Sequence, residues 1–230
     1  MYLLALDTST EAGSAALCLN GQLLERSELA PRRHGERILP MIDALLAEAG
    51  IGKRQLDAIA VGRGPGSFTG VRLGVSLAQG MALGLDLPVV AVSSLAALAL
   101  EAPNDNATIL AAIDARMGEV YMATFRRCCD GLVELLDEEQ VGKADTFSIS
   151  ESATWYGVGN GWQTYREELL GLLPIMPRNI LTDRFPQARN IAQLGVPLWA
   201  AGKACPAEQL QPVYLRNKVA LTRAERAARH

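Results

Sequence analysis

Residues 2–29 read YLLALDTSTEAGSAALCLNGQLLERSEL, and residues 108–136 read TILAAIDARMGEVYMATFRRCCDGLVELL. Each stretch begins with a short apolar run that ends at an aspartate, Asp7 in the first and Asp114 in the second. A hairpin is expected in both, because the Asn-Gly pair of the first and the Asp-Gly pair of the second favour tight turns between strands. The two stretches therefore predict the same three-stranded unit, built twice.

The rest of each half agrees with this duplication. A helical period over residues 35–50 follows the first unit, ahead of a strand and a glycine loop, while residues 154–162 and then 163–173 supply a strand, a glycine turn and a helix in the second half. We therefore predict an α/β fold of two duplicated lobes, residues 1–102 and 103–230, each a mixed sheet with flanking helices. The last helix is a candidate to pack back on the first lobe. Chance agreement between common hairpin turns is the alternative explanation.

Composition limits the function classes. A chain of 230 residues with 49% hydrophobic content can bury a full core, and a net charge of −3 provides no overall positive field for nucleic acid or anionic membrane. The four cysteines form no CxxC pair and no zinc spacing, which favours reduced thiols. We find no signal-peptide pattern and no apolar run long enough for a bilayer. A cytoplasmic protein without a membrane partner is expected.

A glycine loop, GRGPGSFTGVRLG, occupies residues 62–74 directly after an apolar run. Glycines permit close approach of backbone, a proline stiffens the turn, and Ser67 or Thr69 can cap the helix that follows. Phe68 and Arg72 would be available to a partner. The loop residues that we single out are Gly64, Pro65, Gly66, Ser67, Thr69 and Gly70.

Two resemblances follow from these motifs. Duplicated lobes whose first strand ends at an acidic residue resemble the actin, sugar-kinase and heat-shock ATPase (ASKHA) superfamily, in which nucleotide binds between the lobes. The motifs LALDTST, GRGPGSFTGVRLG, IDARMGEVYMATF, VGNG and QPVYLRNKVAL, in that order along nearly the whole chain, resemble the TsaB (YeaZ) family.

The second resemblance implies a function in tRNA modification. It implies a scaffold or activator that binds the threonylcarbamoyl transferase TsaD and supports TsaE-assisted transfer of the threonylcarbamoyl group to the adenosine beside the anticodon of tRNAs reading codons that begin with A. The family is understood to be a non-catalytic paralogue of TsaD, to form a homodimer in isolation and to meet tRNA mainly through the complex. The alternative is a small ATPase, kinase or metallopeptidase of the same superfamily that acts on its own.

The residues agree with a non-catalytic subunit. The catalytic paralogue carries an H-x-x-x-H pair for a metal, but the residue four after His34 is Ile38, and Ser94 and Leu98 occupy the places of a second histidine pair. We therefore predict no metal site, and a helix-entry or surface role for His34.

The phosphate-binding turns are also reduced. The turn at Asp114 continues as Ala-Arg-Met-Gly, so a glycine pair is missing although Arg116 could pair with an anion. The polar turn after the first strand could hold a phosphate, or it could be a capped hairpin turn. We predict weak or absent nucleotide binding by the isolated chain and no cofactor, unless nucleotide binds at the partner interface. The residues of this vestigial phosphate site are Asp7, Thr8, Ser9, Thr10, Asp114 and Arg116.

Two helices are expected to form the partner or dimer interface. In residues 70–88 small residues recur every fourth position at Gly70, Gly74 and Ala78, and close approach of another helix would offset the cost of glycine in a helix. Packing of every apolar position on the lobe's own sheet is the alternative. The predicted interface residues are Ile38, Met41, Ile42, Leu45, Phe68, Arg72, Leu73, Leu77 and Met81.

Two further features have a functional and a structural interpretation. The carboxyl-terminal segment carries Arg216, Lys218, Arg223, Arg226 and Arg229 against one acid, Glu225. These cations could contact tRNA, but the solvated end of a helix is the plainer explanation. The three tryptophans, Trp155, Trp162 and Trp199, are expected in the core or between the lobes rather than as base-stacking platforms.

Overall fold

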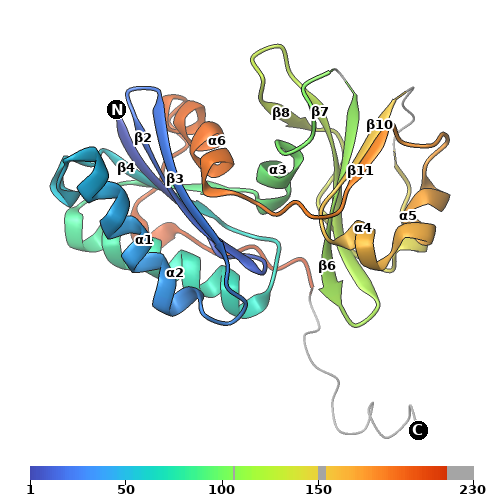
Figure 1. Cartoon of the computed structure of the whole chain (residues 1–230), viewed down its shortest axis with the longest axis horizontal. Helices are drawn as coiled ribbons and strands as arrows, with labels where there is room; N and C mark the ends of the chain where they lie inside the picture. The colour runs from blue at the N-terminus through green and yellow to red at the C-terminus, as the bar shows by residue number, and fades with distance from the viewer. Residues whose placement is uncertain (106, 150–153, 217–230) are drawn as a thin grey trace, which may run out of the picture.

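Two β-sheets stand side by side in the computed structural model, which describes residues 1–105, 107–149 and 154–216 (Figure 1). The first sheet has the strand order β3-β2-β1-β4-β5, in which β1 pairs antiparallel with β2 and parallel with β4. Its strands are β1 (Tyr2–Asp7), β2 (Ala12–Leu19), β3 (Gln22–Leu29), β4 (Ala58–Gly62) and β5 (Val89–Val92).

The second sheet repeats this arrangement. Its strand order is β11-β10-β6-β7-β8, and β6 pairs antiparallel with β7 and parallel with β10, as β1 does with β2 and β4. Its strands are β6 (Thr108–Arg116), β7 (Glu119–Arg127), β8 (Val133–Leu135), β10 (Trp155–Val158) and β11 (Asn179–Leu181), with β9 (Gln140–Gly142) paired to β7. The predicted α/β fold of two mixed sheets with flanking helices is confirmed.

Helices cover both faces of each sheet. Long helices α1 (His34–Ala49) and α2 (Phe68–Leu85) cover one face of the first sheet, and α6 (Ala188–Ala200) covers the other. On the second sheet, α3 (Ser94–Ala99) packs on the face toward α6, and α4 (Gly161–Thr164) and α5 (Arg166–Leu172) cover the far face (Figure 1). Short 3-10 turns lie at Lys53–Gln55, Ala144–Thr146 and Ala207–Gln209.

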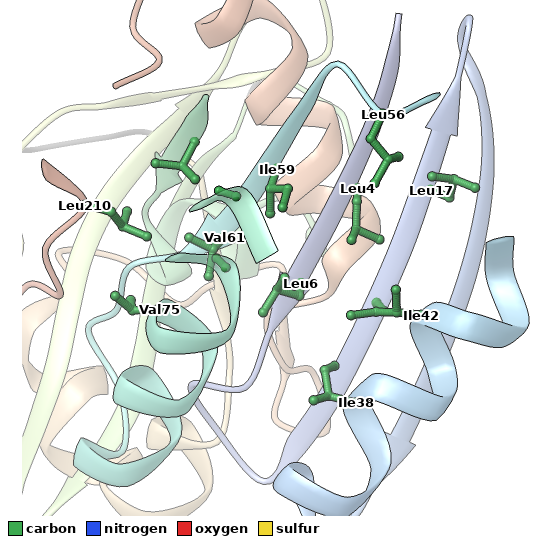
Figure 2. Packing of buried hydrophobic residues seen from close by; sticks show 14 of the residues in the cluster. Leu4, Leu6, Leu17, Ile38, Ile42, Leu56, Ile59, Val61, Val75 and Leu210 are labelled. Carbon is green, nitrogen blue, oxygen red and sulfur yellow. The ribbon is translucent and has the colours of Figure 1, made fainter. Parts of the chain in front are cut away.

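The core of the first lobe lies between its sheet and α1 and α2 (Figure 2). Ile38 and Ile42 of α1 point toward Leu4, Leu6 and Leu17 of the sheet, and all five are essentially inaccessible to solvent. Burying an aliphatic side chain of this size contributes about 1.5–3 kcal/mol. The inward stripe of α1 is therefore the main reason that this helix lies on the sheet.

The chain returns to the first lobe after building the second. α6 packs against β1, β2 and β4, and Cys205 then exchanges backbone hydrogen bonds with Val89 of β5. The backbone N–H of Val213 donates to the carbonyl of Arg63 in the glycine loop. Residues 205–216 thus bring the end of the described chain to the junction of the two lobes.

Candidate functional site

A cavity of about 310 Å³ lies between the two lobes, where the turns that follow β1, β4, β6 and β10 meet. Ligands of α/β sheets commonly bind at the carboxyl ends of parallel strands, which is the edge that these turns occupy. Four of the six residues predicted for a vestigial phosphate site, Ser9, Thr10, Asp114 and Arg116, line the cavity, whereas Asp7 and Thr8 do not. The full lining is Ser9, Thr10, Glu11, Gly66, Ser67, Phe68, Val71, Ile113, Asp114, Ala115, Arg116, Met117, Tyr121, Asn160, Val213, Tyr214 and Arg216.

The turn after β1 is buried, and its polar groups form hydrogen bonds with other groups of the chain. Asp7 Oδ1 accepts hydrogen bonds from the backbone N–H and the hydroxyl of Ser9, at 2.8 and 2.7 Å, and Oδ2 accepts one from the Ser94 hydroxyl at 3.0 Å. Burial raises the pKa of Asp7 from 3.8 to about 6, and these hydrogen bonds oppose the rise. The hydroxyl of Thr8 donates to the carbonyl of Gly70, so this residue is also used within the chain. These bonds favour the interpretation of a capped turn.

The glycine loop packs closely against the turn after β1. A Cβ at Gly66 would overlap the carbonyl oxygen of Ser9, and a Cβ at Gly70 would overlap that of Thr8. Gly64 adopts a φ of +93°, which disfavours any other residue. The close backbone approach that the sequence predicts is therefore made to the chain's own first turn. Ser67, rather than Thr69, is the N-cap of α2, and its hydroxyl accepts from the Gly70 N–H at 3.1 Å.

The end of β6 and the turn after it adopt a strained backbone. Arg116 and Met117 have φ values of +61° and +60°, and Gly118 has a φ of +78°. Such left-handed conformations are normally taken by glycine and are costly for residues with a Cβ. The glycine pair is missing from the sequence, but the backbone keeps the shape that glycines favour. Two long side chains therefore project from this turn, and Met117 is 66% exposed.

Glu11 joins the two lobes across the cavity. Its Oε1 lies 2.7 Å from Arg116 Nη2, and its Oε2 accepts a hydrogen bond from Asn160 Nδ2 at 3.1 Å. Arg116 Nη1 also lies 3.1 Å from Asp114 Oδ2. Glu11 is not among the residues that the sequence pattern singles out, because its partners are 105 and 149 positions away along the chain. Its place directly after the Asp-Thr-Ser-Thr turn was the available signal.

Two aromatic residues that line the cavity, Phe68 and Tyr214, hold Arg72. The Arg72 guanidinium lies 3.5 Å from the centre of the Phe68 ring, and its Nε donates to the Tyr214 hydroxyl at 2.6 Å. Arg72 is thus held by its own chain, whereas Phe68 remains 42% exposed. Arg63 of the glycine loop also pairs with Glu139 of the second lobe, at 3.2 Å.

The interface prediction needs correction for α1. Ile38, Ile42 and Leu45 are buried beneath the helix in the core of the first lobe, so they are not available to a partner. Their spacing marks the face of α1 that packs on the sheet. The other predicted apolar residues of the two helices, Met41, Leu73, Leu77 and Met81, are half-buried.

The small residues of α2 also pack within the chain. Gly70, Gly74 and Ala78 are buried, and a Cβ at Gly74 would lie 2.7 Å from the Thr8 hydroxyl. The expected approach of another helix to this stripe is therefore wrong, because β1 and its turn fill that place. Gly80 and Gly84 differ, since a Cβ at either would meet no atom within 4 Å.

No group of three or more His, Cys, Asp or Glu residues within residues 1–105, 107–149 and 154–216 is arranged to hold a metal ion. His34 begins α1, as expected for a helix-entry residue, but it is buried rather than on the surface. Its Nε2 lies 2.9 Å from the Thr10 carbonyl oxygen. Ser94 donates to Asp7, and Leu98 is in the core of the second lobe.

The remaining sequence features are placed as follows. Trp155 and Trp162 are in the core as predicted, whereas Trp199 is 37% exposed at the end of α6 and is not part of the core. All four cysteines are free. Arg216 pairs with Glu119, while Lys218, Arg223, Arg226 and Arg229 lie outside the described residues. None of the described helices is long and apolar enough to cross a membrane.

Comparisons with known proteins agree with one another. Residues 26–153 match the family described as "TsaD: tRNA N6-adenosine threonylcarbamoyltransferase". The chain is 42% identical over 228 residues to the tRNA threonylcarbamoyladenosine biosynthesis protein TsaB of Escherichia coli K12, covering 96% of each chain. It is 39% identical over 231 residues to the protein of the same name from Haemophilus influenzae, covering 95% of each. The solved structure of YeaZ from Pseudomonas aeruginosa superposes with a TM-score of 0.86 at 43% identity, covering 93% of this chain and 99% of that one.

Proposed function

The chain belongs to the TsaB (YeaZ) family and has a role in the biosynthesis of threonylcarbamoyladenosine in tRNA; from that premise we propose that it is a non-catalytic subunit that binds TsaD. In this role it supports TsaE-assisted transfer of the threonylcarbamoyl group, in the cytoplasm, to the adenosine beside the anticodon. tRNA would be held mainly by the complex, in keeping with the net charge of −3.

The observation that carries the proposal is the use of the inter-lobe cavity by the chain's own side chains. In the ASKHA superfamily the nucleotide binds between the lobes, and here the side chains of these turns, Glu11, Arg116 and Asn160, bond to one another across the cavity. The Asp7 carboxylate is fully buried and bonded to Ser9 and Ser94. Side chains that pair across the cavity in this way occupy the place of a nucleotide, which favours a binding role over a catalytic one.

The outer face of α1 and α2 is the surface that we assign to TsaD. Half-buried Met41, Leu77 and Met81 lie at the edge of the core, and Gly80 and Gly84 leave open space beside them. Glycine in a helix interior costs about 1 kcal/mol relative to alanine, so exposed glycines on a stable helix are unfavourable unless another backbone approaches them. A second copy of the chain would use the same face, so homodimer and TsaD complex would compete.

Omission of single components tests the function. The purified chain is mixed with TsaD, TsaE, a threonylcarbamoyl-adenylate source and unmodified tRNA, and each component is left out in turn. We expect modification to slow strongly without this chain. Modification at an unchanged rate, or ATP turnover by this chain alone, would contradict the proposal.

Substitutions on α2 test the surface. Leu77→Glu and Gly80→Glu should each weaken association with TsaD by about 30-fold, since burying a charge in an apolar interface costs about 2 kcal/mol or more. Gly80→Glu adds its side chain where no atom lies within 4 Å, so the fold should be kept. Met176→Glu, at a 72% exposed residue of the second lobe, is the matched control. Sedimentation of the mixtures measures association, and unchanged binding by both α2 variants would exclude this face.

A further inference from the structure

We propose that the adjacent thiols of Cys128 and Cys129 form a redox modification site, which a hydroperoxide oxidises to a reversible disulfide. The pair lies on the second lobe, in the turn between β7 and β8, whereas the α1–α2 face belongs to the first lobe. The inference therefore goes beyond the proposed function and does not depend on it.

The two thiols are both free, and they differ in their access to solvent. Cys129 is exposed, whereas Cys128 is half-buried. Burial raises the pKa of the Cys128 thiol, and the carboxylates of Asp130 and Glu134 raise this pKa further. Redox-sensing cysteines commonly combine an accessible thiol with a neighbouring thiol that resolves its oxidised form. Cys129 is thus placed to meet the oxidant, and Cys128 is placed to resolve the product.

The oxidation proceeds in two steps. The Cys129 thiolate attacks one oxygen of the hydroperoxide and the O–O bond breaks, which leaves a sulfenic acid on Cys129 and releases an alcohol, or water where the oxidant is hydrogen peroxide. The Cys128 sulfur then attacks the Cys129 sulfur, the S–O bond breaks, and the hydroxide leaves as water with the proton of the Cys128 thiol. Two electrons pass from the two thiols to the peroxide, and the products are one disulfide, one alcohol and one water.

Closing this bond must change the shape of the turn. In the reduced chain the Cys128 N–H donates to the Leu132 carbonyl at 2.9 Å, and the Gly131 N–H donates to the Cys128 carbonyl at 3.0 Å. Neighbouring Cα atoms lie about 3.8 Å apart, below the range of about 4.4–6.8 Å that is usual for a disulfide. The turn backbone must therefore shift when the bond forms, and a strained disulfide of this kind is easily reduced again.

Arg127 links the turn to the segment that joins α3 to β6. Its buried guanidinium donates to the Gly131 carbonyl at 2.8 Å, and also to the carbonyls of Leu100 and Ala102 at 2.6 and 2.5 Å. Gly131 lies beside the same segment, since a Cβ on it would be 3.9 Å from Asn104 Nδ2. A shift of Gly131 would take one acceptor away from a buried cation, which is costly. Oxidation of the pair should therefore loosen this segment.

Treatment of the intact chain with hydrogen peroxide, followed by maleimide labelling and mass spectrometry, tests the inference. The native chain should lose two of its four thiols and become lighter by two hydrogen atoms, and dithiothreitol should restore both thiols. Cys128→Ser should stop at a sulfenic acid on Cys129 that dimedone traps. Cys129→Ser should show neither product.

Cys205→Ser is the matched control, because Cys205 is a half-buried free thiol outside the pair. This variant should still lose two thiols. Hydrogen exchange over residues 100–104 should become faster after oxidation in the native chain and in Cys205→Ser, but not in Cys128→Ser.

Several results would overturn the proposal. They are retention of all four thiols by the native chain, a native Cys129 that stops at sulfenic or sulfinic acid, a disulfide-linked dimer in place of the internal bond, and loss of two thiols from Cys129→Ser. Unchanged exchange over residues 100–104 in the oxidised native chain would overturn the link through Arg127. Failure of TsaD binding would change none of these results, so the two proposals fail separately.

Discussion

The turns after β1 and β6 hold equivalent positions in the two lobes but use them differently. The first turn is buried, holds a carboxylate with a raised pKa and is covered by the glycine loop. The second is exposed and strained, and its Arg116 reaches across to the first lobe. The equivalent strand end is therefore packed inside its own lobe in the first case and contacts the opposite lobe in the second.

The largest expected effect comes from disturbing the buried turn. Gly70→Ala would place a Cβ on the Thr8 carbonyl oxygen, and backbone on both sides must shift. We expect the free energy of unfolding to fall by more than about 3 kcal/mol, because overpacking against backbone has no cheap relaxation. Urea unfolding measures the change.

Gly80→Ala is its control on the same helix. The new methyl group meets no atom within 4 Å, and alanine is the better helix former by about 1 kcal/mol, so this variant should be the more stable one. Equal effects from both substitutions would show that the contact between α2 and the first turn is not tight.

The sequence predicted the architecture because the relevant signals are local. The repeated run-aspartate-hairpin pattern predicts both sheets, since strand periodicity and turn dipeptides act over a few residues. The roles of Gly70 and Glu11 depend on contacts to residues 62 and 105 positions away, which no local pattern contains. Burial of Ile38 was misassigned for a related reason: an apolar helical stripe does not state whether a sheet or a partner covers it.

A second, smaller effect is the pH dependence of stability, in which Asp7 and Asp114 are expected to differ. Asp7 has a pKa of about 6 in the folded chain against 3.8 in the unfolded chain. Asp7 therefore stays protonated to a higher pH in the folded chain than in the unfolded chain. The stability that this proton contributes is fully present below pH 3.8 and is lost as the pH rises through about 6. The difference between the two pKa values corresponds to a loss of about 3 kcal/mol at most in the free energy of unfolding.

Asp7→Asn should remove this loss, since an amide can accept from Ser9 and donate to the Ser94 hydroxyl. We expect higher stability than the native chain at pH 8 and near equality at pH 3.5. Asp114→Asn should instead lower stability at pH 8 by up to about 1 kcal/mol, because Arg116 loses a charged partner. Unfolding curves at several pH values distinguish the two, and a destabilised Asp7→Asn at pH 8 would mean that Asp7 is needed as a carboxylate.

The smallest expected effect lies in the strained turn. Met117 has a φ of +60° and its side chain is 66% exposed, so its replacement costs little packing. Glycine removes a strain of roughly 1–2 kcal/mol but adds about 0.5–1 kcal/mol of backbone entropy to the unfolded chain. Met117→Gly should therefore stabilise the protein by about 0.5–1 kcal/mol. Gly118→Ala, at a φ of +78° with open space around its Cβ, should cost roughly the same amount. Opposite signs for neighbouring residues in thermal unfolding would identify backbone strain as the cause, whereas destabilisation by both would assign Met117 a packing role instead.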